Sequence, residues 1–403
     1  MRRRITTVTL ALEGGTPVRN TMLNYGRQSI DEEDIEAVVQ VLKGDWLTTG
    51  PTVAAFEKAV ADFLGAKEAV AVNSGTAALH AAAFAAEIGP GDEVIVPAIT
   101  FVASSNCVLY MGGKPVFADL VPGTLNLDPA DVERKITPKT KAIVAVDYAG
   151  QPCEHAKLRA LADRHKLIVI EDASHALGAT YHGRKVGTLH EFTTLSFHPV
   201  KHITTAEGGM IVTNDTALAI KMRSFRTHGI DLDFHKRAES NLWLYDVVTL
   251  GYNYRLPDIN CALGLSQLAK LSGWLNRRRE IAACYNRAFA STTEIELPVI
   301  IPDCEAAWHL YVIRLNLDRL RAGRAEIFKA LRAENIGVNV HYIPIPWLTN
   351  YQKMGYSKGQ WPVAESEYER ILSLPIFPGM SDDDVDDVII AVKKVLEHYS
   401  VAH

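Results

Sequence analysis

One turn and two charged side chains stand out in the sequence because each follows a short apolar run. Asn73-Ser74-Gly75-Thr76 comes after the first such run, and its small residues predict a helix start whose free amides favour an anion. Asp172 closes a later run, where a buried carboxylate needs a cationic partner. Lys201 follows 201 − 172 = 29 positions further on, in a polar loop. A desolvated lysine amine can attack a carbonyl, so the loop could carry covalent chemistry.

Each feature taken alone has an ordinary structural explanation. Ser-Gly-Thr is a common helix start, a strand-end acid can cap a helix, and most lysines are solvated surface charges. The combination is more specific, because pyridoxal phosphate requires all three groups. A helix start binds its phosphate, the lysine holds its aldehyde as an imine, and the acid keeps the pyridine nitrogen protonated. The order Thr76, Asp172, Lys201 therefore predicts this cofactor.

The elements around these residues alternate between short apolar runs and helical patterns. Continuous apolar runs of this length are typical of a parallel sheet buried on both faces, so the alternation predicts an α/β fold with a mostly parallel sheet. Ligands of such sheets bind at the carboxyl ends of the strands, which is where the three features lie. The predicted strands are Ala69–Val72, Val94–Pro97, Pro115–Ala118, Ala142–Val146 and Leu167–Ile170, with later runs at Thr193–Leu195 and Met210–Val212. The predicted helices between them are Ala77–Ala86, Val102–Tyr110, Pro129–Lys135 and Ala156–His165.

The rest of the chain predicts a smaller C-terminal α+β domain. A long helix begins near Asp258, and the boundary is expected inside it. We predict an N-terminal arm over residues 1–22, a large domain over 23–270 and a small domain over 271–403. Strands are expected at Leu310–Leu315 and Val338–His341, and helices at Arg324–Glu334 and Asp382–Tyr399.

Composition excludes several classes of protein. The chain has 403 residues, 48% of them hydrophobic, and a net charge of −5, so a broad basic face for nucleic acid is not expected. Its apolar runs are shorter than the ~20 residues that span a bilayer. The start of the chain lacks a convincing cleavage site for export. Five scattered cysteines without a Cys-x-x-Cys pair favour reduced thiols over disulfides or zinc. We expect a cytoplasmic protein without a metal site.

From about Leu23 to Leu396, the chain resembles the DegT/DnrJ/EryC1/StrS sugar aminotransferases, which have the aspartate-aminotransferase fold. The resemblance rests on six segments: Gly44–Pro51, Asn73–Thr76, Pro97–Phe101, Glu171–Ala176, Ser196–Gly209 and Gly251–Arg255. Within the family, the chain is most similar to the aminotransferases of the pseudaminic acid pathway. That similarity lies in Tyr25–Ile30, Gly150–Cys153, Ser196–Thr205 and Leu374–Met380.

The resemblance implies a role for each matching residue. Lys201 is the Schiff-base lysine and proton shuttle, and Asp172 is the partner of the pyridine nitrogen. The residues implied to bind the cofactor besides these two are Gly75, Thr76 and Ser196 at the phosphate, Phe101 stacked on the ring, and His175 beside Asp172. Asn253 and Arg255 are implied to reach the cofactor phosphate and the substrate from the neighbouring subunit of a homodimer. The remaining implied substrate contacts are Tyr25, Thr48 and His341.

Structural alternatives remain open for several of these residues. Phe101 can be a core residue, Tyr25 can anchor the N-terminal arm, and His175 can be a satisfied structural histidine. His341 can simply close a strand.

The resemblance also implies a reaction. L-glutamate donates its amino group to the cofactor, which passes it to C4 of a UDP-linked 4-keto-6-deoxy-N-acetylhexosamine. The alternatives are another keto sugar or keto-cyclitol, with a C3 ketone or a dTDP or GDP carrier, or a sugar enzyme with this cofactor that does not transaminate. Related dehydratases carry His at the position of Lys201, which argues against them. A nicotinamide-dependent enzyme would need a Gly-x-Gly-x-x-Gly loop, and the sequence has none.

Overall fold

A seven-stranded sheet forms the centre of the large domain in the computed structural model, which describes residues 9–231 and 243–401. The strand order is β1-β9-β8-β5-β4-β2-β3. The strands are β1 (Glu68–Val72), β2 (Glu93–Pro97), β3 (Lys114–Ala118), β4 (Thr140–Val146), β5 (Ile168–Asp172), β8 (Phe192–Ser196) and β9 (Gly209–Thr213). All run parallel except β9, which is antiparallel to both of its neighbours. The predicted α/β fold with a mostly parallel sheet is confirmed.

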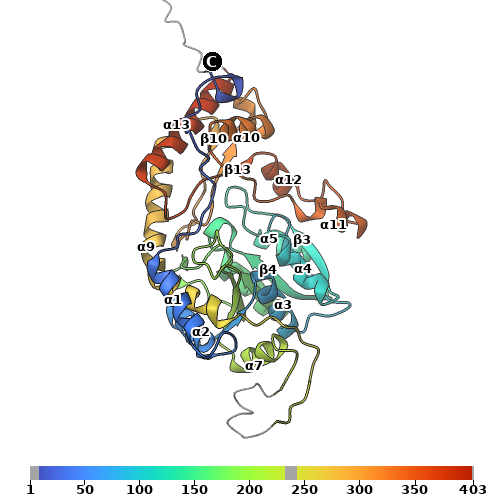
Figure 1. Ribbon diagram of the computed structural model, residues 1–403. Helices are drawn as coiled ribbons and strands as arrows, with labels where there is room; N and C mark the ends of the chain where they lie inside the picture. The colour runs from blue at the N-terminus through green and yellow to red at the C-terminus, as the bar shows by residue number, and fades with distance from the viewer. Residues whose placement is uncertain (1–8, 232–242, 402–403) are drawn as a thin grey trace, which may run out of the picture.

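Helices cover both faces of this sheet, so the central residues of its strands are mostly apolar (Figure 1). Alternate residues of β1 separate the two faces. Val70 and Val72 belong to the core beneath α3, α4 and α7, whereas Ala69 and Ala71 pack toward α2 and the first half of α9. Near β4 and β5, helices α5 and α6 complete the second face. These helices are α2 (Pro51–Leu64), α3 (Gly75–Ala85), α4 (Ala103–Tyr110), α5 (Pro129–Lys135), α6 (His155–His165), α7 (Thr216–Phe225) and α9 (Asp258–Phe289).

The C-terminal part forms a second core around a small antiparallel sheet (top of Figure 1). Helices α10 and α13 and the second half of α9 surround this sheet. Its elements are β10 (Ile295–Glu296), β12 (Tyr311–Leu315), β13 (Ile371–Leu374), α10 (Arg324–Ala333) and α13 (Asp382–Tyr399). A third, minor sheet joins β6 (Thr180–Tyr181), β7 (Arg184–Lys185) and β11 (Cys304–Glu305).

The prediction of a strand at Val338–His341 is wrong. This segment pairs with β13 only at Asn339 and Ser373. The side chain of Asn339 accepts the N–H of Val340 at 2.8 Å, so that amide cannot take part in a longer ladder. The apolar run Val338–Val340 instead joins the small core as an irregular segment.

Two segments connect the cores. Helix α1 (Glu32–Lys43), capped by Asp31, lies along α9, where Gln267 donates to the buried Asp34 at 2.7 Å. Helices α11 (Thr349–Lys353) and α12 (Pro362–Tyr368) return to the large sheet, where the indole of Trp361 donates to the carbonyl of Phe117 at 2.8 Å. Because α9 is continuous across residue 270, the domain boundaries at 22 and 270 stay a prediction.

No helix in the part of the chain that the structure describes is both long enough and apolar enough to cross a membrane.

Candidate active site

Asp172 is the last residue of β5, and its buried carboxylate is held from two sides. The Ser104 hydroxyl, from α4, donates to Oδ2 at 2.7 Å. The backbone N–H of Ser174 donates to Oδ1 at 3.2 Å. Thr100 lies one turn before Ser104, and the two hydroxyl oxygens are 2.9 Å apart. These contacts fix the orientation of an acid that parallel-sheet geometry places at the ligand-binding edge.

Lys201 lies in the loop after β8, at the same edge of the sheet, and is partly buried. Burial lowers the pKa of its amine to about 8, although the charge of Asp172 opposes this shift. An amine with this pKa is substantially neutral near physiological pH, as a nucleophile or a base must be.

Histidines surround Lys201. Burial, followed by the charges of Lys201, His341 and His202, lowers the pKa of His175 well below its usual value. The ring of His309 lies 4.3 Å from that of His175, and the charge of Lys201 also lowers the pKa of His309, after burial. These histidines are therefore neutral at physiological pH, so none competes with Lys201 for the negative charge of Asp172.

The start of α3 supplies the predicted anion site. Ser74 caps this helix: its side chain accepts the N–H of Ala77 at 3.1 Å, and its carbonyl accepts that of Ala78 at 3.0 Å. The amides of Gly75 and Thr76 belong to the first turn, which has no intrahelical acceptors. A side-chain carbon on Gly75 would lie 2.9 Å from Cβ of Ser196, so glycine is needed for this close approach to β8.

Two aromatic residues of the predicted site lie beside the histidines. Phe101 is exposed, and its ring lies 6.0 Å from that of Tyr342. The hydroxyl of Tyr342 contacts Nε2 of His175 at 3.2 Å. The ring of Tyr25 lies 5.1 Å from that of His341, whose Nδ1 is 2.8 Å from the hydroxyl of Ser373. Both residues therefore border the site that contains Lys201.

Three predicted residues lie elsewhere in the chain. Thr48 and Arg255 line a separate cavity of about 520 Å³, together with Trp46 and Arg226, and neither Lys201 nor Asp172 lines it. Asn253 is exposed, and its carbonyl accepts a hydrogen bond from the side chain of Asn73 at 3.4 Å. In this chain Thr48 and Arg255 line that cavity, and Asn253 lies beside Asn73, which directly precedes the cap of α3.

Sequence reasoning missed several residues of the site. Ser104 had a usable signal, because Thr100 and Ser104 are hydroxyl residues four positions apart just after a predicted strand. His309 had none, since only the return of the small domain brings it to the edge of the large sheet, whereas Tyr342 follows His341, a predicted substrate contact.

Comparison with known proteins agrees with this arrangement. A model of the DegT/DnrJ/EryC1/StrS aminotransferase family matches residues 28–393. The chain belongs to this family. Among curated members, the spore coat polysaccharide biosynthesis protein SpsC of Bacillus subtilis is 44% identical over 382 residues, which cover 94% of this chain and 98% of SpsC.

Solved structures of the family superpose closely. The putative sugar aminotransferase Spr1654 of Streptococcus pneumoniae, in its PMP form, is 32% identical with a TM-score of 0.88, covering 93% of this chain and 99% of Spr1654. PseC of Helicobacter pylori, an aminotransferase of pseudaminic acid biosynthesis, is 35% identical with a TM-score of 0.87, covering 94% of this chain and all of PseC. The protein is a sugar aminotransferase with pyridoxal phosphate as its cofactor.

The residues present fit this cofactor. The first amides of α3 offer an anion site, Asp172 offers a fixed carboxylate, and Lys201 offers an amine of lowered pKa, all at one edge of the sheet.

Proposed function

We propose that the enzyme transfers an amino group from L-glutamate to C4 of a UDP-linked 4-keto-6-deoxy-N-acetylhexosamine. The observation that carries the transamination chemistry is the meeting of Asp172, Lys201 and the start of α3 at one sheet edge. The similarity to PseC over the whole chain supports this class of substrate. The net charge of −5 agrees with a small nucleotide-sugar ligand rather than a polyanion.

Each residue of the proposed site has a defined task. When bound, pyridoxal phosphate supplies an electron-accepting ring that stabilises negative charge at the donor carbon. Asp172 holds the proton on the pyridine nitrogen, and Ser104 keeps the acid in place. The amides of Gly75 and Thr76 and the hydroxyl of Ser196 bind the phosphate. Phe101 covers one face of the ring.

Lys201 performs the proton transfers. Its amine would hold the cofactor at rest and would be free to act as a base when the amino donor is bound. Its neutral amine then removes a proton from the donor carbon and returns it to the cofactor carbon. The pKa of about 8 leaves enough neutral amine for this task near neutral pH. His175, kept neutral and in contact with Tyr342, supports the cofactor side that faces Asp172.

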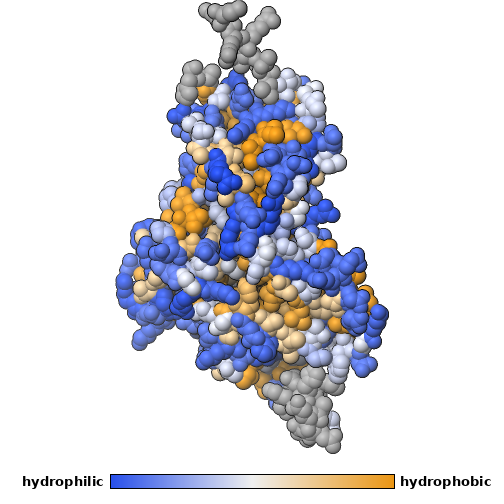
Figure 2. Space-filling model, turned by 90° about the vertical axis from the view of Figure 1, so that its left-hand side faces the viewer, coloured by the Kyte–Doolittle hydropathy of each residue, from blue (hydrophilic) through white to orange (hydrophobic). Residues whose placement is uncertain are grey.

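A second copy of the chain completes the proposed site. We assign Asn253 and Arg255 to the partner's site in a homodimer, because Asn253 is exposed and Arg255 lines a cavity that neither Lys201 nor Asp172 lines. Large apolar side chains near them are exposed, Trp243 at 84% and Leu250 at 81%. Apolar side chains also gather on the lower half of the face that carries α1 and α9 (Figure 2). Exposed apolar surface of this kind is typical of subunit interfaces.

A different keto sugar is the second candidate. The identity to SpsC, at 44%, is higher than the 35% to PseC, and SpsC is named only for spore coat polysaccharide biosynthesis. Another ketone position or nucleotide would use the same cofactor residues.

A substrate panel separates these candidates. Purified enzyme is incubated with L-glutamate and, in turn, UDP-, dTDP- and GDP-linked keto sugars, and the products are identified by mass spectrometry and NMR. Amination at C4 of the UDP-linked N-acetyl sugar is expected. Efficient amination of another sugar alone would refute the substrate proposal while leaving transamination intact.

The role of Lys201 is tested by spectroscopy. The wild-type protein should show the visible absorption of lysine-bound cofactor, and borohydride should fix the cofactor on a peptide that contains Lys201. Lys201→Ala should lose both signals and all transfer. Lys201→Arg is the matched control for charge, since it keeps a cation that cannot bond the cofactor. Turnover by Lys201→Ala would show that the lysine is misassigned.

A further inference from the structure

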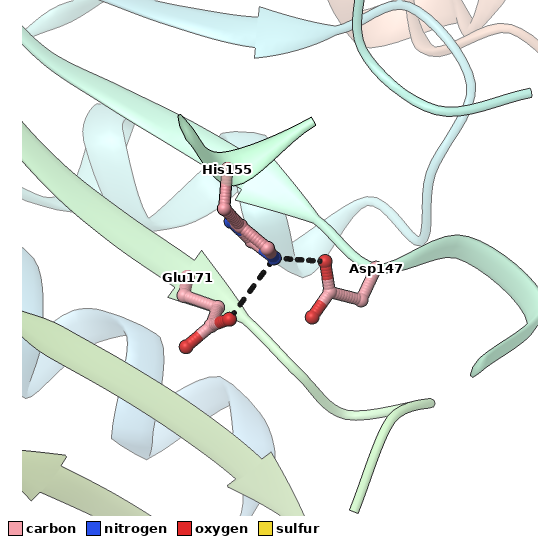
Figure 3. A group of neighbouring side chains, drawn as sticks. All are labelled: Asp147, His155 and Glu171. Carbon is pink, nitrogen blue, oxygen red and sulfur yellow. Dashed lines mark ion pairs between the residues drawn. The ribbon is translucent and has the colours of Figure 1, made fainter. Parts of the chain in front are cut away.

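A buried group of charged side chains lies on the opposite face of β5 from Asp172. Successive residues of a strand point to opposite faces, so Glu171 points away from the cofactor and toward α6. There Nε2 of His155 lies 2.9 Å from Oδ1 of Asp147 and 3.1 Å from Oε1 of Glu171 (Figure 3). All three side chains are at most 2% exposed. The proposed chemistry uses none of them.

Few other charges surround Asp147, His155 and Glu171, which we call the triad. Thr193 donates to Glu171 at 2.5 Å, and the backbone N–H of Cys153 donates to Asp147 at 2.9 Å. His190 contacts Nδ1 of His155 through Nε2 at 2.9 Å, and burial keeps its pKa well below the usual value. The other titratable or charged groups that face the triad or His190 are Cys153, Arg159, Tyr181 and Arg184. Arg159 itself is paired with Glu191 at 2.7 Å.

Charge balance restricts the protonation of the triad. Two buried carboxylates facing one histidine would leave a net negative charge even with an imidazolium between them. Burial raises the pKa of Glu171 to about 7, and His155 only partly offsets this. Burial alone lowers the pKa of His155, but the charges of Asp147 and Glu171 outweigh burial and raise it. An imidazolium between the two acids, with one acid proton shared by them, is the neutral arrangement. Nδ1 of His155 can then donate to His190, while Nε2 faces both acids at ion-pair distance without a hydrogen bond to either.

The triad is joined to the active site through the backbone. Glu171 directly precedes Asp172 in β5, and the N–H of Asp147 donates to the carbonyl of Asp172 at 3.1 Å. Two residues after Asp147, the N–H of Ala149 donates to Nδ1 of His175 at 3.3 Å. Both acids of the triad therefore contact the backbone of Asp172. Glu171 is its neighbour along β5, and Asp147 is hydrogen-bonded to it from the adjacent strand end.

We propose that Asp147, His155 and Glu171 act as one charge-balanced unit that positions Asp172 against the cofactor. They are positioning residues, since they reach the cofactor only through Asp172 and His175. The proposal rests on the role assigned above to Asp172. It predicts that removing the imidazolium alone leaves one uncompensated negative charge buried between the two acids, which displaces the ends of β4 and β5.

A double-mutant cycle tests the unit. Near-isosteric amides remove charge with little change in volume, so His155→Gln, Asp147→Asn and their double variant form the cycle, and Glu171→Gln is compared with them. The readouts are the dissociation constant of pyridoxal phosphate and the absorption spectrum of the lysine-bound cofactor. His155→Gln should weaken cofactor binding about 10-fold or more and alter the spectrum. Glu171→Gln, which mimics the protonated acid, should stay within about 3-fold of the wild type.

Rescue is the decisive outcome. The double variant removes the negative charge of Asp147 together with the positive one and leaves Glu171 as the protonated acid, so the group stays neutral and its cofactor binding should return to within about 3-fold of the wild type. A merely steric role predicts a double variant no better than His155→Gln, and that result would overturn the proposal. If His155→Gln does not fold, the double variant must still fold and bind cofactor, and its failure to do so would equally refute the unit.

Control variants separate the role of the triad from the role assigned to Asp172. Glu133→Gln removes a surface partner of Arg164 on the same side of the sheet and should leave all readouts unchanged. Asp172→Asn should weaken cofactor binding; if it does not, the role of Asp172 fails, whatever the triad does. Normal binding by His155→Gln together with impaired Asp172→Asn would refute the triad alone. A stoichiometric divalent metal in the purified protein would also overturn the shared-proton arrangement, because the triad would then be a set of ligands.

Discussion

At the scale of single residues, the contact between Ser104 and Asp172 makes the sharpest prediction. Ser104→Ala removes the 2.7 Å donor to Oδ2 and leaves part of a buried acid unsatisfied. A hydrogen bond to a charged group contributes about 1.5–3 kcal/mol, so cofactor affinity should fall about 10-fold or more. Titration of the apoenzyme with pyridoxal phosphate measures this effect. Ser105→Ala, one position along α4, is the matched control and should bind normally.

The lowered pKa of Lys201 predicts a pH effect on the cofactor-free protein. The amine loses its proton near pH 8 when folded but only near 10.5 when unfolded. Between these values the unfolded state binds more protons, so rising pH should stabilise the wild type relative to Lys201→Met. Urea midpoints of both apoproteins, measured from pH 7.5 to pH 10, test the sign. Parallel midpoints across that range would contradict the lowered pKa.

At the scale of elements, the start of α3 depends on its closeness to β8. In Gly75→Ala, the new methyl group would lie 2.9 Å from Cβ of Ser196, so the helix start must move away from the strand. Overpacking of this kind costs about 1–3 kcal/mol, and the displaced amides should also bind the cofactor less tightly. Thermal unfolding and cofactor titration measure the two effects. Gly89→Ala, which adds a methyl group in open space, should cause neither.

Glu171, at the end of β5 facing α6, predicts how the stability of the protein depends on pH. Glu171 has a pKa of about 7 in the folded protein, against an ordinary value of 4.5. Between those values the folded state binds the extra proton, so stability should fall as pH rises from about 5 to 7. Glu171→Gln cannot titrate and should lose this part of the pH dependence. Denaturation midpoints at several pH values would show it, and an unchanged slope would contradict the raised pKa.

At the scale of the whole molecule, the proposed homodimer predicts complementation between inactive variants. Lys201→Ala removes the lysine of its own site, whereas Asn253→Ala removes a residue that we assign to the partner's site. Co-expressed chains form mixed dimers in which one of the two sites keeps both residues, so purified mixed dimers should recover about half of wild-type activity. Activity of tagged, purified mixed dimers measures this. No recovery in verified mixed dimers would place Asn253 outside the shared site.

The sequence by itself determined the fold class and most of the chemistry. Alternating short apolar runs and helices dictate a sheet buried on both faces, and ligands of such sheets bind at the strand ends. That rule was enough to select Thr76, Asp172 and Lys201, because each follows its own strand directly. The local apolar pattern wrongly predicted a strand at Val338–His341. There the side chain of Asn339 accepts the N–H of Val340, which a strand would need for its ladder.

Only the tertiary structure decided which distant residues share a site. Ser104 reaches Asp172 because α4 packs on the same face of the sheet, and Tyr342 reaches His175 because the small domain returns to the strand ends. It also placed Glu171 and Asp172, neighbours in sequence, on opposite faces, one buried beside His155 and the other at the cofactor edge. Burial and neighbouring charges set the pKa values of Lys201 and Glu171, and both are long-range properties that adjacent residues do not specify.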